Sequence, residues 1–196
     1  MKHGLALFFF VPVGAACFDS HAQTSQAAMC YLPVQPPVAF NQLNAKDPAI
    51  RISSENVNLS GNQTAEFIGN VEISYRDTLL IAPKANFSSS QQTVLAAGGI
   101  EYFNSSIQVS GSEFSADLIN DKASLNDANY RFLEQAGRGY AAELTATEQV
   151  LTLDSALFTT CPVDDNSWAL HASEIRIEES EGWGEARNAV FKIKDI

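Results

Sequence analysis

The sequence predicts an all-β domain, a solenoid-like or jelly-roll body of stacked hairpins, preceded by a signal peptide and an extended tether. Three observations support this fold class. From residue 50 onward, apolar residues recur at every second position, as in strands with one buried face. Short motifs rich in glycine, asparagine and aspartate separate these runs. The hairpin pattern also repeats, with an offset of 28 or 29 residues.

Residues 1–22 are typical of a cleaved secretory signal. A single cation precedes an apolar run at 5–16, and the small residues Ser20 and Ala22 occupy the positions that a signal peptidase reads. The run is shorter than the roughly 20 residues of a membrane-spanning helix. Acylation of Cys17 is an alternative, although a glycine stands where lipoprotein signals usually carry leucine. We therefore expect the mature chain outside the cytoplasm.

Residues 23–49 are polar, rich in proline and without a period, which favours an extended tether. The tether contains Cys30, and the predicted domain at 50–196 contains Cys161. These are the two cysteines left once residues 1–22 are removed. In an oxidising compartment they could bond each other, or each could bond a partner.

The predicted strands follow one another through the whole domain. The alternating apolar positions are Ile52, Val57, Leu59, Phe67, Val71, Ile73, Leu79, Ile81, Ile100, Tyr102, Ile107, Val109, Phe114, Leu118, Leu151, Leu153, Trp168, Leu170, Ile175, Ile177, Phe191 and Ile193. Turn motifs between them include Ser60-Gly61-Asn62, Arg76-Asp77, Gly98-Gly99, Asn104-Ser105 and Asn120-Asp121. Single hairpins cannot bury their apolar faces alone. We therefore expect them to stack into an elongated body of two facing sheets, with a slot-shaped interior and exposed edge strands.

Composition and charge exclude several functions. The net charge is −11, and removal of residues 1–22 takes away one charge of each sign. Such an acidic surface repels nucleic acid, so no nucleic-acid partner is expected. His171 is the only histidine beyond the signal, and neither a metal site nor a serine triad is visible. We predict no catalytic residue and no cofactor. A secreted β-solenoid enzyme acting on polysaccharide would need an acidic cleft from Asp164, Asp165 and Glu174.

The many apolar side chains on one face of the predicted strands have two interpretations. They form an ordinary core, or they line a groove between splayed sheets that holds the acyl chains of a lipid. The sequence alone does not separate these interpretations. The candidate groove positions are Phe67, Val71, Ile73, Leu79, Ile81, Ile100, Tyr102, Ile107, Val109, Phe114, Leu151 and Leu153.

A local signature near the C-terminus points to a family. Thr159-Thr160-Cys161-Pro162 is followed by Asp165-Asn166-Ser167-Trp168 and by Ala186-Arg187-Asn188-Ala189-Val190-Phe191-Lys192-Ile193. This block resembles the N-terminal periplasmic domain of the LptD family of outer-membrane lipopolysaccharide-assembly proteins. The hairpins between Phe67 and Ala85 are similar to the OstA-like repeats that this family shares with the bridge protein LptA. The resemblance covers Cys30 to Ile193.

The resemblance implies a curved β-jelly roll of stacked hairpins (OstA-like). It also implies a non-enzymatic, lipid-conducting role at the periplasmic face of the outer membrane. Such a domain receives lipopolysaccharide from LptA by edge-strand addition and shields its acyl chains on the way to a β-barrel that acts with the lipoprotein LptE. The edge around Ile52 to Leu59 would be the docking strand. Cys30 and Cys161 match two family cysteines that cross-link to a cysteine pair in the barrel.

The family continues into a barrel, whereas this chain stops at Ile196. We therefore expect a truncated or split gene product, or a domain that works with a separate barrel. In this chain alone Cys30 and Cys161 would bond each other or stay free. A stand-alone bridge or chaperone of the same fold is the alternative. The missing barrel favours that alternative, and the two cysteines disfavour it.

Overall fold

The computed structural model describes residues 37–41, 43–46, 49–61, 63–163, 165, 167–178 and 183–194. The predicted signal and Cys30 lie outside the described residues. One short helix, α1 (Val38–Asn41), precedes the strands. Within the described part of the chain, no helix has the length and apolar character needed to cross a membrane.

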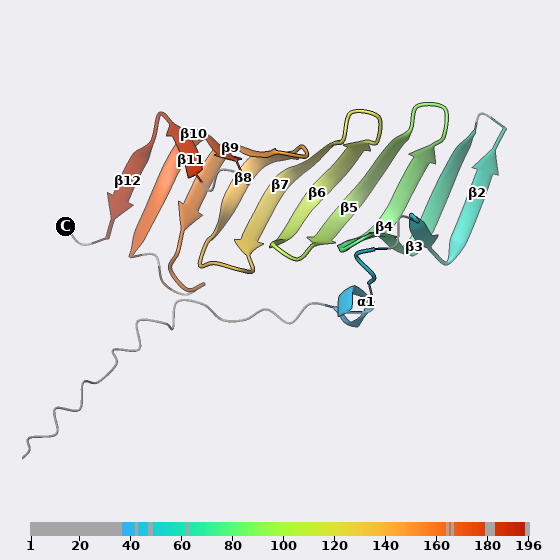
Figure 1. Cartoon of the computed structure of the whole chain (residues 1–196), viewed down its shortest axis with the longest axis horizontal. Helices are drawn as coiled ribbons and strands as arrows, with labels where there is room; N and C mark the ends of the chain where they lie inside the picture. Colours follow the sequence, from blue (N-terminus) through green and yellow to red (C-terminus); the bar gives the residue numbers. More distant parts are fainter. Residues whose placement is uncertain are drawn as a thin grey trace, which may run out of the picture.

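Among the described residues, twelve strands form a single antiparallel sheet (Figure 1). They are β1 (Arg51–Ser53), β2 (Asn56–Ser60), β3 (Thr64–Tyr75), β4 (Thr78–Ser88), β5 (Thr93–Phe103), β6 (Ile107–Asp117), β7 (Lys122–Phe132), β8 (Arg138–Ala146), β9 (Val150–Thr159), β10 (Trp168–Glu178), β11 (Trp183–Arg187) and β12 (Val190–Ile193). From β3 to β10 each strand pairs with the next. The predicted all-β, stacked-hairpin fold is confirmed.

The long strands bend near their middles. Residues with positive φ lie at four of these bends, at Gly69, Gly98, Asp127 and Ser155, with φ between 49° and 96°. Successive members of this series are 29, 29 and 28 residues apart, so the repeat seen in two hairpins continues through four. The strand register shifts at the bends of β3, β4 and β5, and such bulges increase the local twist and bend of a strand.

The bends divide the sheet into two walls. The first wall comprises β1, β12 and residues 71–75, 78–82, 100–103, 107–111, 128–132, 138–141, 156–159 and 168–172. The second wall comprises β2, β11 and residues 64–68, 84–88, 93–97, 113–117, 122–126, 143–146, 150–154 and 174–178. The expected pair of facing sheets is therefore one sheet folded along a line of bends.

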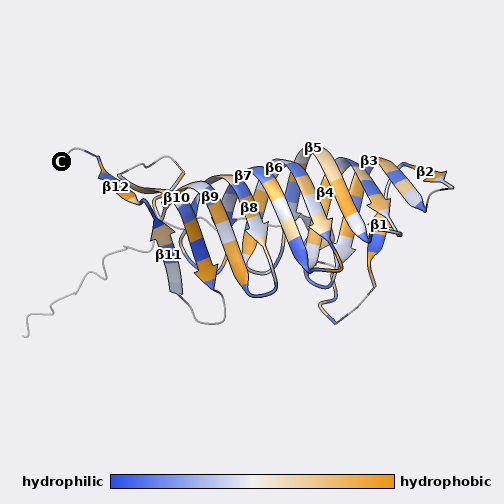
Figure 2. Cartoon of the chain, turned by 90° about the horizontal axis from the view of Figure 1, so that it is seen from above, coloured by the Kyte–Doolittle hydropathy of each residue, from blue (hydrophilic) through white to orange (hydrophobic). Residues whose placement is uncertain are grey.

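Both walls contribute to one hydrophobic cluster, which lies between them. Val71, Ile100 and Val109 of the first wall and Leu125 and Leu153 of the second are members, each at most 3% exposed. Hydrophobic and hydrophilic residues alternate along the strands, as one inner and one outer face require (Figure 2). We call the space between the two inner faces the slot.

Two sequence interpretations near the bends were wrong. Gly98-Gly99, expected as a turn, lies inside β5, where both residues have positive φ and form the bend. Leu79 and Ile81 lie on the outer face of the first wall. The two-residue turn at 76–77 pairs Ile73 with Leu80, so Leu80 and not Leu79 shares the inner face. The run from Leu79 to Ala82 is apolar on both faces, and alternation could not decide between them.

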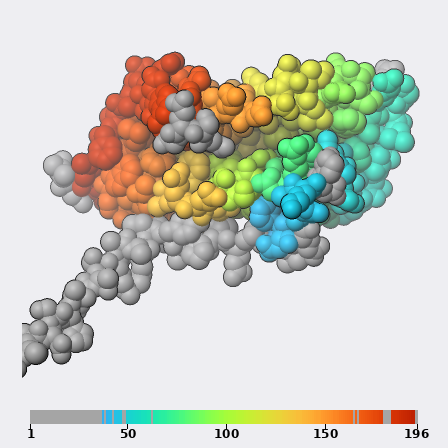
Figure 3. Space-filling view, viewed as in Figure 1, coloured from blue at the N-terminus to red at the C-terminus, as the bar shows by residue number. Residues whose placement is uncertain are grey.

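The outer position of Leu79 has a structural use. The ring of its register partner Phe103 packs against Phe40 of α1 in a tilted arrangement, with ring centroids 6.4 Å apart. Leu79 is only 1% exposed although it lies outside the inner cluster. Figure 3 shows the α1 segment, in blue, lying against the body of the sheet. The α1 segment is therefore packed on the outer surface of the first wall.

Candidate functional site

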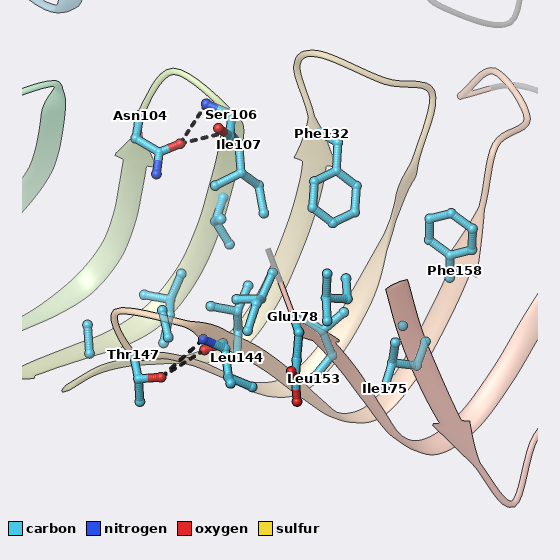
Figure 4. A pocket seen from close by; sticks show the side chains of 18 of the residues that line it. Asn104, Ser106, Ile107, Phe132, Leu144, Thr147, Leu153, Phe158, Ile175 and Glu178 are labelled. Atoms are coloured by element: carbon cyan, nitrogen blue, oxygen red, sulfur yellow. Dashed lines mark hydrogen bonds between the residues drawn. The ribbon is translucent and has the colours of Figure 1, made fainter. Parts of the chain in front are cut away.

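The slot contains a cavity of about 800 Å³. Its lining comes from strands β5 to β11 of both walls and is mostly apolar. In Figure 4, Ile107, Phe132 and Phe158 of the first wall project into the same space as Leu144 and Leu153 of the second. Apolar clefts of several hundred Å³ with a few polar groups at the margin are typical of small-molecule and lipid sites. The polar groups here, including Asn104, Thr147 and Glu178, are at or near the hairpin tips (Figure 4).

The repeat explains why the cavity occupies only the C-terminal part of the slot. One inner position shortly after each bend recurs at a spacing of 28 or 29 residues. It is occupied in turn by Val71, Ile100, Ala128 and Ala156, and all four residues belong to the inner cluster. Side-chain volume at this position therefore falls from valine and isoleucine to alanine after β6. In the described part of β1–β4, no residue lines the cavity.

Ten of the twelve candidate groove positions belong to the inner cluster or pack against it. Those that also line the cavity are Tyr102, Ile107, Val109, Phe114, Leu151 and Leu153. Those that fill the slot nearer the N-terminal edge are Phe67, Val71, Ile73 and Ile100. The remaining two, Leu79 and Ile81, lie on the outer face. Their side chains point away from the cavity and are not part of the site.

Sequence reasoning missed several cavity residues in the middle of the domain. These are Leu125, Phe132, Leu144 and Phe158. The repeat was recognised only in the first two hairpins. Two more repeats at the same spacing would have located these strands, because the bends recur at Asp127 and Ser155.

Tyr130 links strands β7 and β9 of the first wall. Its hydroxyl donates to the carbonyl of Leu157 at 2.9 Å, across the strand that lies between them. Gly139 on that strand makes the crossing possible, since a Cβ there would lie 1.8 Å from the same carbonyl oxygen. Burial raises the pKa of Tyr130 above its ordinary value of 10.0.

Cys161 is buried in the loop between β9 and β10, and it forms no disulfide with another described residue. Arg138 holds this loop: its Nε donates to the carbonyl of Cys161 at 2.8 Å, and a terminal nitrogen donates to the carbonyl of Asp165 at 3.0 Å. Thr159 closes the loop, because its Oγ1 donates to the carbonyl of Trp168 at 2.7 Å and accepts from the N–H of Cys161. The residues of the Thr-Thr-Cys-Pro block therefore fix a loop conformation.

The acidic cleft that a polysaccharide enzyme would need is not formed by the described residues. Glu174 points to the outer face of β10 and pairs with Arg187 at 3.0 Å. Asp165 accepts hydrogen bonds from Ser167, which lower the pKa of its carboxyl group. Neither carboxylate lines the cavity, and Asp164 lies outside the described residues. Among those residues, no group of three or more histidine, cysteine or acidic side chains could hold a metal ion.

Both ends of the sheet carry exposed apolar edges. At the N-terminal end, Val57 and Leu59 of β2 are 49% and 81% exposed. At the C-terminal end, Val190, Phe191 and Ile193 of β12 are at least half exposed. Exposed edge strands can add a strand from another chain.

Comparison with known proteins agrees with this geometry. The family model described as "LptA/(LptD N-terminal domain) LPS transport protein" matches residues 51–183. The LPS-assembly protein LptD of Pseudoalteromonas translucida is 39% identical over 146 residues, which are 74% of this chain and 20% of that protein. LptD of Shewanella denitrificans is 34% identical over 170 residues, 83% of this chain and 22% of that protein. The chain thus spans about a fifth of the length of these relatives.

A solved structure of LptH from Pseudomonas aeruginosa, described as the LptA-homologous periplasmic component of a lipopolysaccharide transport device, covers 74% of this chain and 95% of its own. Its identity to this chain is 12%, and its TM-score is 0.33. The family model matches more than half of the chain, over the strands that build the slot. The chain therefore belongs to the LptA and LptD N-terminal domain family of lipopolysaccharide-transport proteins.

Proposed function

We propose that this domain conducts lipopolysaccharide, with the acyl chains inside the slot and the sugars outside. The observation that carries the proposal is the apolar cavity of about 800 Å³ between the two inner faces. Removing a methylene from water is worth about 0.8 kcal/mol, so acyl chains gain strongly from such an interior. The net charge of −11 supports recognition through acyl chains, since an anionic headgroup gains nothing from an acidic surface.

Lipid is delivered at the N-terminal edge in this proposal. β2 pairs with β3 on one side, and all five of its residues are exposed. A bridge protein of the LptA type would add a strand along β2, which aligns its own slot with this one. Apolar side chains are then continuous from Ile52 and Phe67 at this edge into the cluster.

The other end of the pathway rests on family resemblance. We propose that the domain works at the periplasmic face of the outer membrane, after removal of residues 1–22 and with residues 23–49 as its tether. A β-barrel and the lipoprotein LptE are the partners proposed at the C-terminal end. A disulfide from Cys161 to a partner requires that the Arg138-held loop opens, because the thiol is buried. Cys30, the second candidate, lies outside the described residues.

Site-specific photo-crosslinking tests this function. A crosslinking amino acid at Val109, which lies in the inner cluster, is expected to capture lipopolysaccharide. The matched controls are Ser110, its outward neighbour, and Ile81 on the outer face of the same wall. Both controls are expected to remain unlabelled. Equal labelling at Val109 and Ser110 would contradict the slot.

A further inference from the structure

One pair of aromatic rings joins the two walls across the slot. Five aromatic pairs occur among the described residues, and four of them lie on one wall or on the outer surface: Phe40–Phe103, Tyr130–Phe132, Phe158–Trp168 and Trp168–Phe191. The fifth pair, Tyr102 of the first wall and Phe114 of the second, has ring centroids 6.5 Å apart and an interplanar angle of 21°. These two stacked rings therefore bridge the slot.

The pair marks the N-terminal limit of the cavity. Tyr102 and Phe114 line it, as do residues of later strands, whereas the described residues of β1–β4 do not. On the other side of the pair the slot is filled, with Val71 fully buried and Ile73 packed against the cluster. The rings thus separate a filled N-terminal segment from the open cavity.

The tyrosine ring is held from the slot margin. Asn104 Nδ2 donates to the Tyr102 hydroxyl at 3.4 Å. Asn104 is itself fixed at the β5–β6 tip, because its Oδ1 accepts the N–H groups of Ser106 at 2.9 Å and Ile107 at 2.8 Å. Phe114 is half-buried and faces Tyr102 from the opposite wall. Rotation of the Phe114 ring is therefore the smaller change that would part the pair.

We propose that Tyr102 and Phe114 form a gate, which an acyl chain moving from the N-terminal edge must open to reach the cavity. The inference rests on the proposed lipid-conducting function and adds a step to it. Stacking favours the closed state when the slot is empty. An entering acyl chain replaces the ring contact with its own apolar contacts, so the rings close again after it has passed.

The gate is tested by the order in which lipopolysaccharide reaches the two sides of the aromatic pair. Crosslinking amino acids are placed at Ile73, before the pair, and at Leu153, in the cavity beyond it. The full chain is mixed with an LptA-type bridge protein loaded with rough lipopolysaccharide and irradiated after increasing times. Labelling at Ile73 is expected to precede labelling at Leu153.

Opening the gate is expected to shorten this delay. In Phe114→Ala the delay should fall by roughly two- to tenfold, the rate change that corresponds to loss of one aromatic pair. Phe114→Leu removes the ring and keeps much of the apolar volume, so it gives the same test if the alanine variant does not fold. Tyr140→Ala is the matched control, because it removes an exposed aromatic ring of the first wall that does not line the cavity. Its delay is expected to match that of the unaltered chain.

Different results of this experiment would overturn the gate and the proposed function. Simultaneous labelling at Ile73 and Leu153, unchanged in Phe114→Leu, would overturn the gate and leave conduction intact. An equal change in Tyr140→Ala and Phe114→Leu would also overturn it, since any lost ring would then have the same effect. Absence of label at both positions would overturn the proposed function and the gate with it.

Discussion

Gly139 gives the sharpest stability prediction, because two strands and a tyrosine meet where a side chain would be. In Gly139→Ala the new Cβ would lie 1.8 Å from the carbonyl oxygen of Leu157 and 2.7 Å from the Tyr130 hydroxyl. The first contact is to backbone and can be relieved only if β8 moves away from β9. The second displaces the hydroxyl that donates to Leu157.

The cost follows from these two contacts. Overpacking of a filled interior costs about 1–3 kcal/mol, and loss of the buried hydrogen bond adds about 1 kcal/mol. For a domain of this size, a loss of about 3 kcal/mol lowers the melting temperature by roughly 6–12 °C. Thermal unfolding followed by circular dichroism measures the shift.

Gly184→Ala is the matched control. Its Cβ would meet the nearest atom, the carbonyl oxygen of Arg176, at 3.4 Å, an ordinary contact. We expect its melting temperature to remain close to that of the unaltered chain. Equal melting temperatures for Gly139→Ala and Gly184→Ala would refute the close approach of β8 and β9 at Gly139.

Three further predictions concern the loop, alkaline stability and access to the cavity. Cys161 should react slowly with a water-soluble thiol reagent. Arg138→Ala should speed the reaction roughly tenfold or more, since hydrogen bonds to a charged group contribute about 1.5–3 kcal/mol each. Equal rates would show that the Arg138 hydrogen bonds do not hold the loop closed. Because the folded pKa of Tyr130 is raised above 10.0, its stabilising contribution is full below pH 10 and falls above it by up to about 1.4 kcal/mol per pH unit. Urea unfolding at pH 9 to 11 should show a smaller alkaline loss for Tyr130→Phe, and an identical loss would count against burial of the phenol. Gly184→Leu places a side chain in the cavity without backbone strain. It should therefore change stability by less than about 1.5 kcal/mol and lower lipopolysaccharide labelling at Leu153. Full labelling would show that this end of the cavity is not used.

Alternation and turn chemistry carried enough information for the fold class. In β9, Leu151 and Leu153 alternate with the polar residues Thr152 and Asp154, which indicated the inner face. In β4 the apolar run includes Leu79 and Leu80, and the face was set by the pairing of Leu80 with Ile73 across a two-residue turn. Such a choice depends on turn geometry, which periodicity does not contain.

The bends and the cavity were harder to predict for a related reason. A glycine pair such as Gly98-Gly99 is compatible both with a turn between strands and with a bulge inside one strand. The cavity depends on small volume differences, with Ala128 and Ala156 standing where earlier repeats have larger side chains. These differences acquire meaning only once the repeat fixes which residues share a position.

In the proposed function, acyl chains and not sugars occupy the slot. Methyl groups of Val109 and Leu153 face the slot, whereas those of Ile81 and Leu95 lie outside the inner cluster. The direct measurement uses the chain with labelled methyl groups, bound to unlabelled rough lipopolysaccharide, and records nuclear Overhauser contacts between the two. We expect contacts from acyl methylenes to Val109 and Leu153 and none to Ile81 or Leu95. Contacts from acyl chains to the outer methyl groups, or from sugars alone to the inner ones, would contradict it.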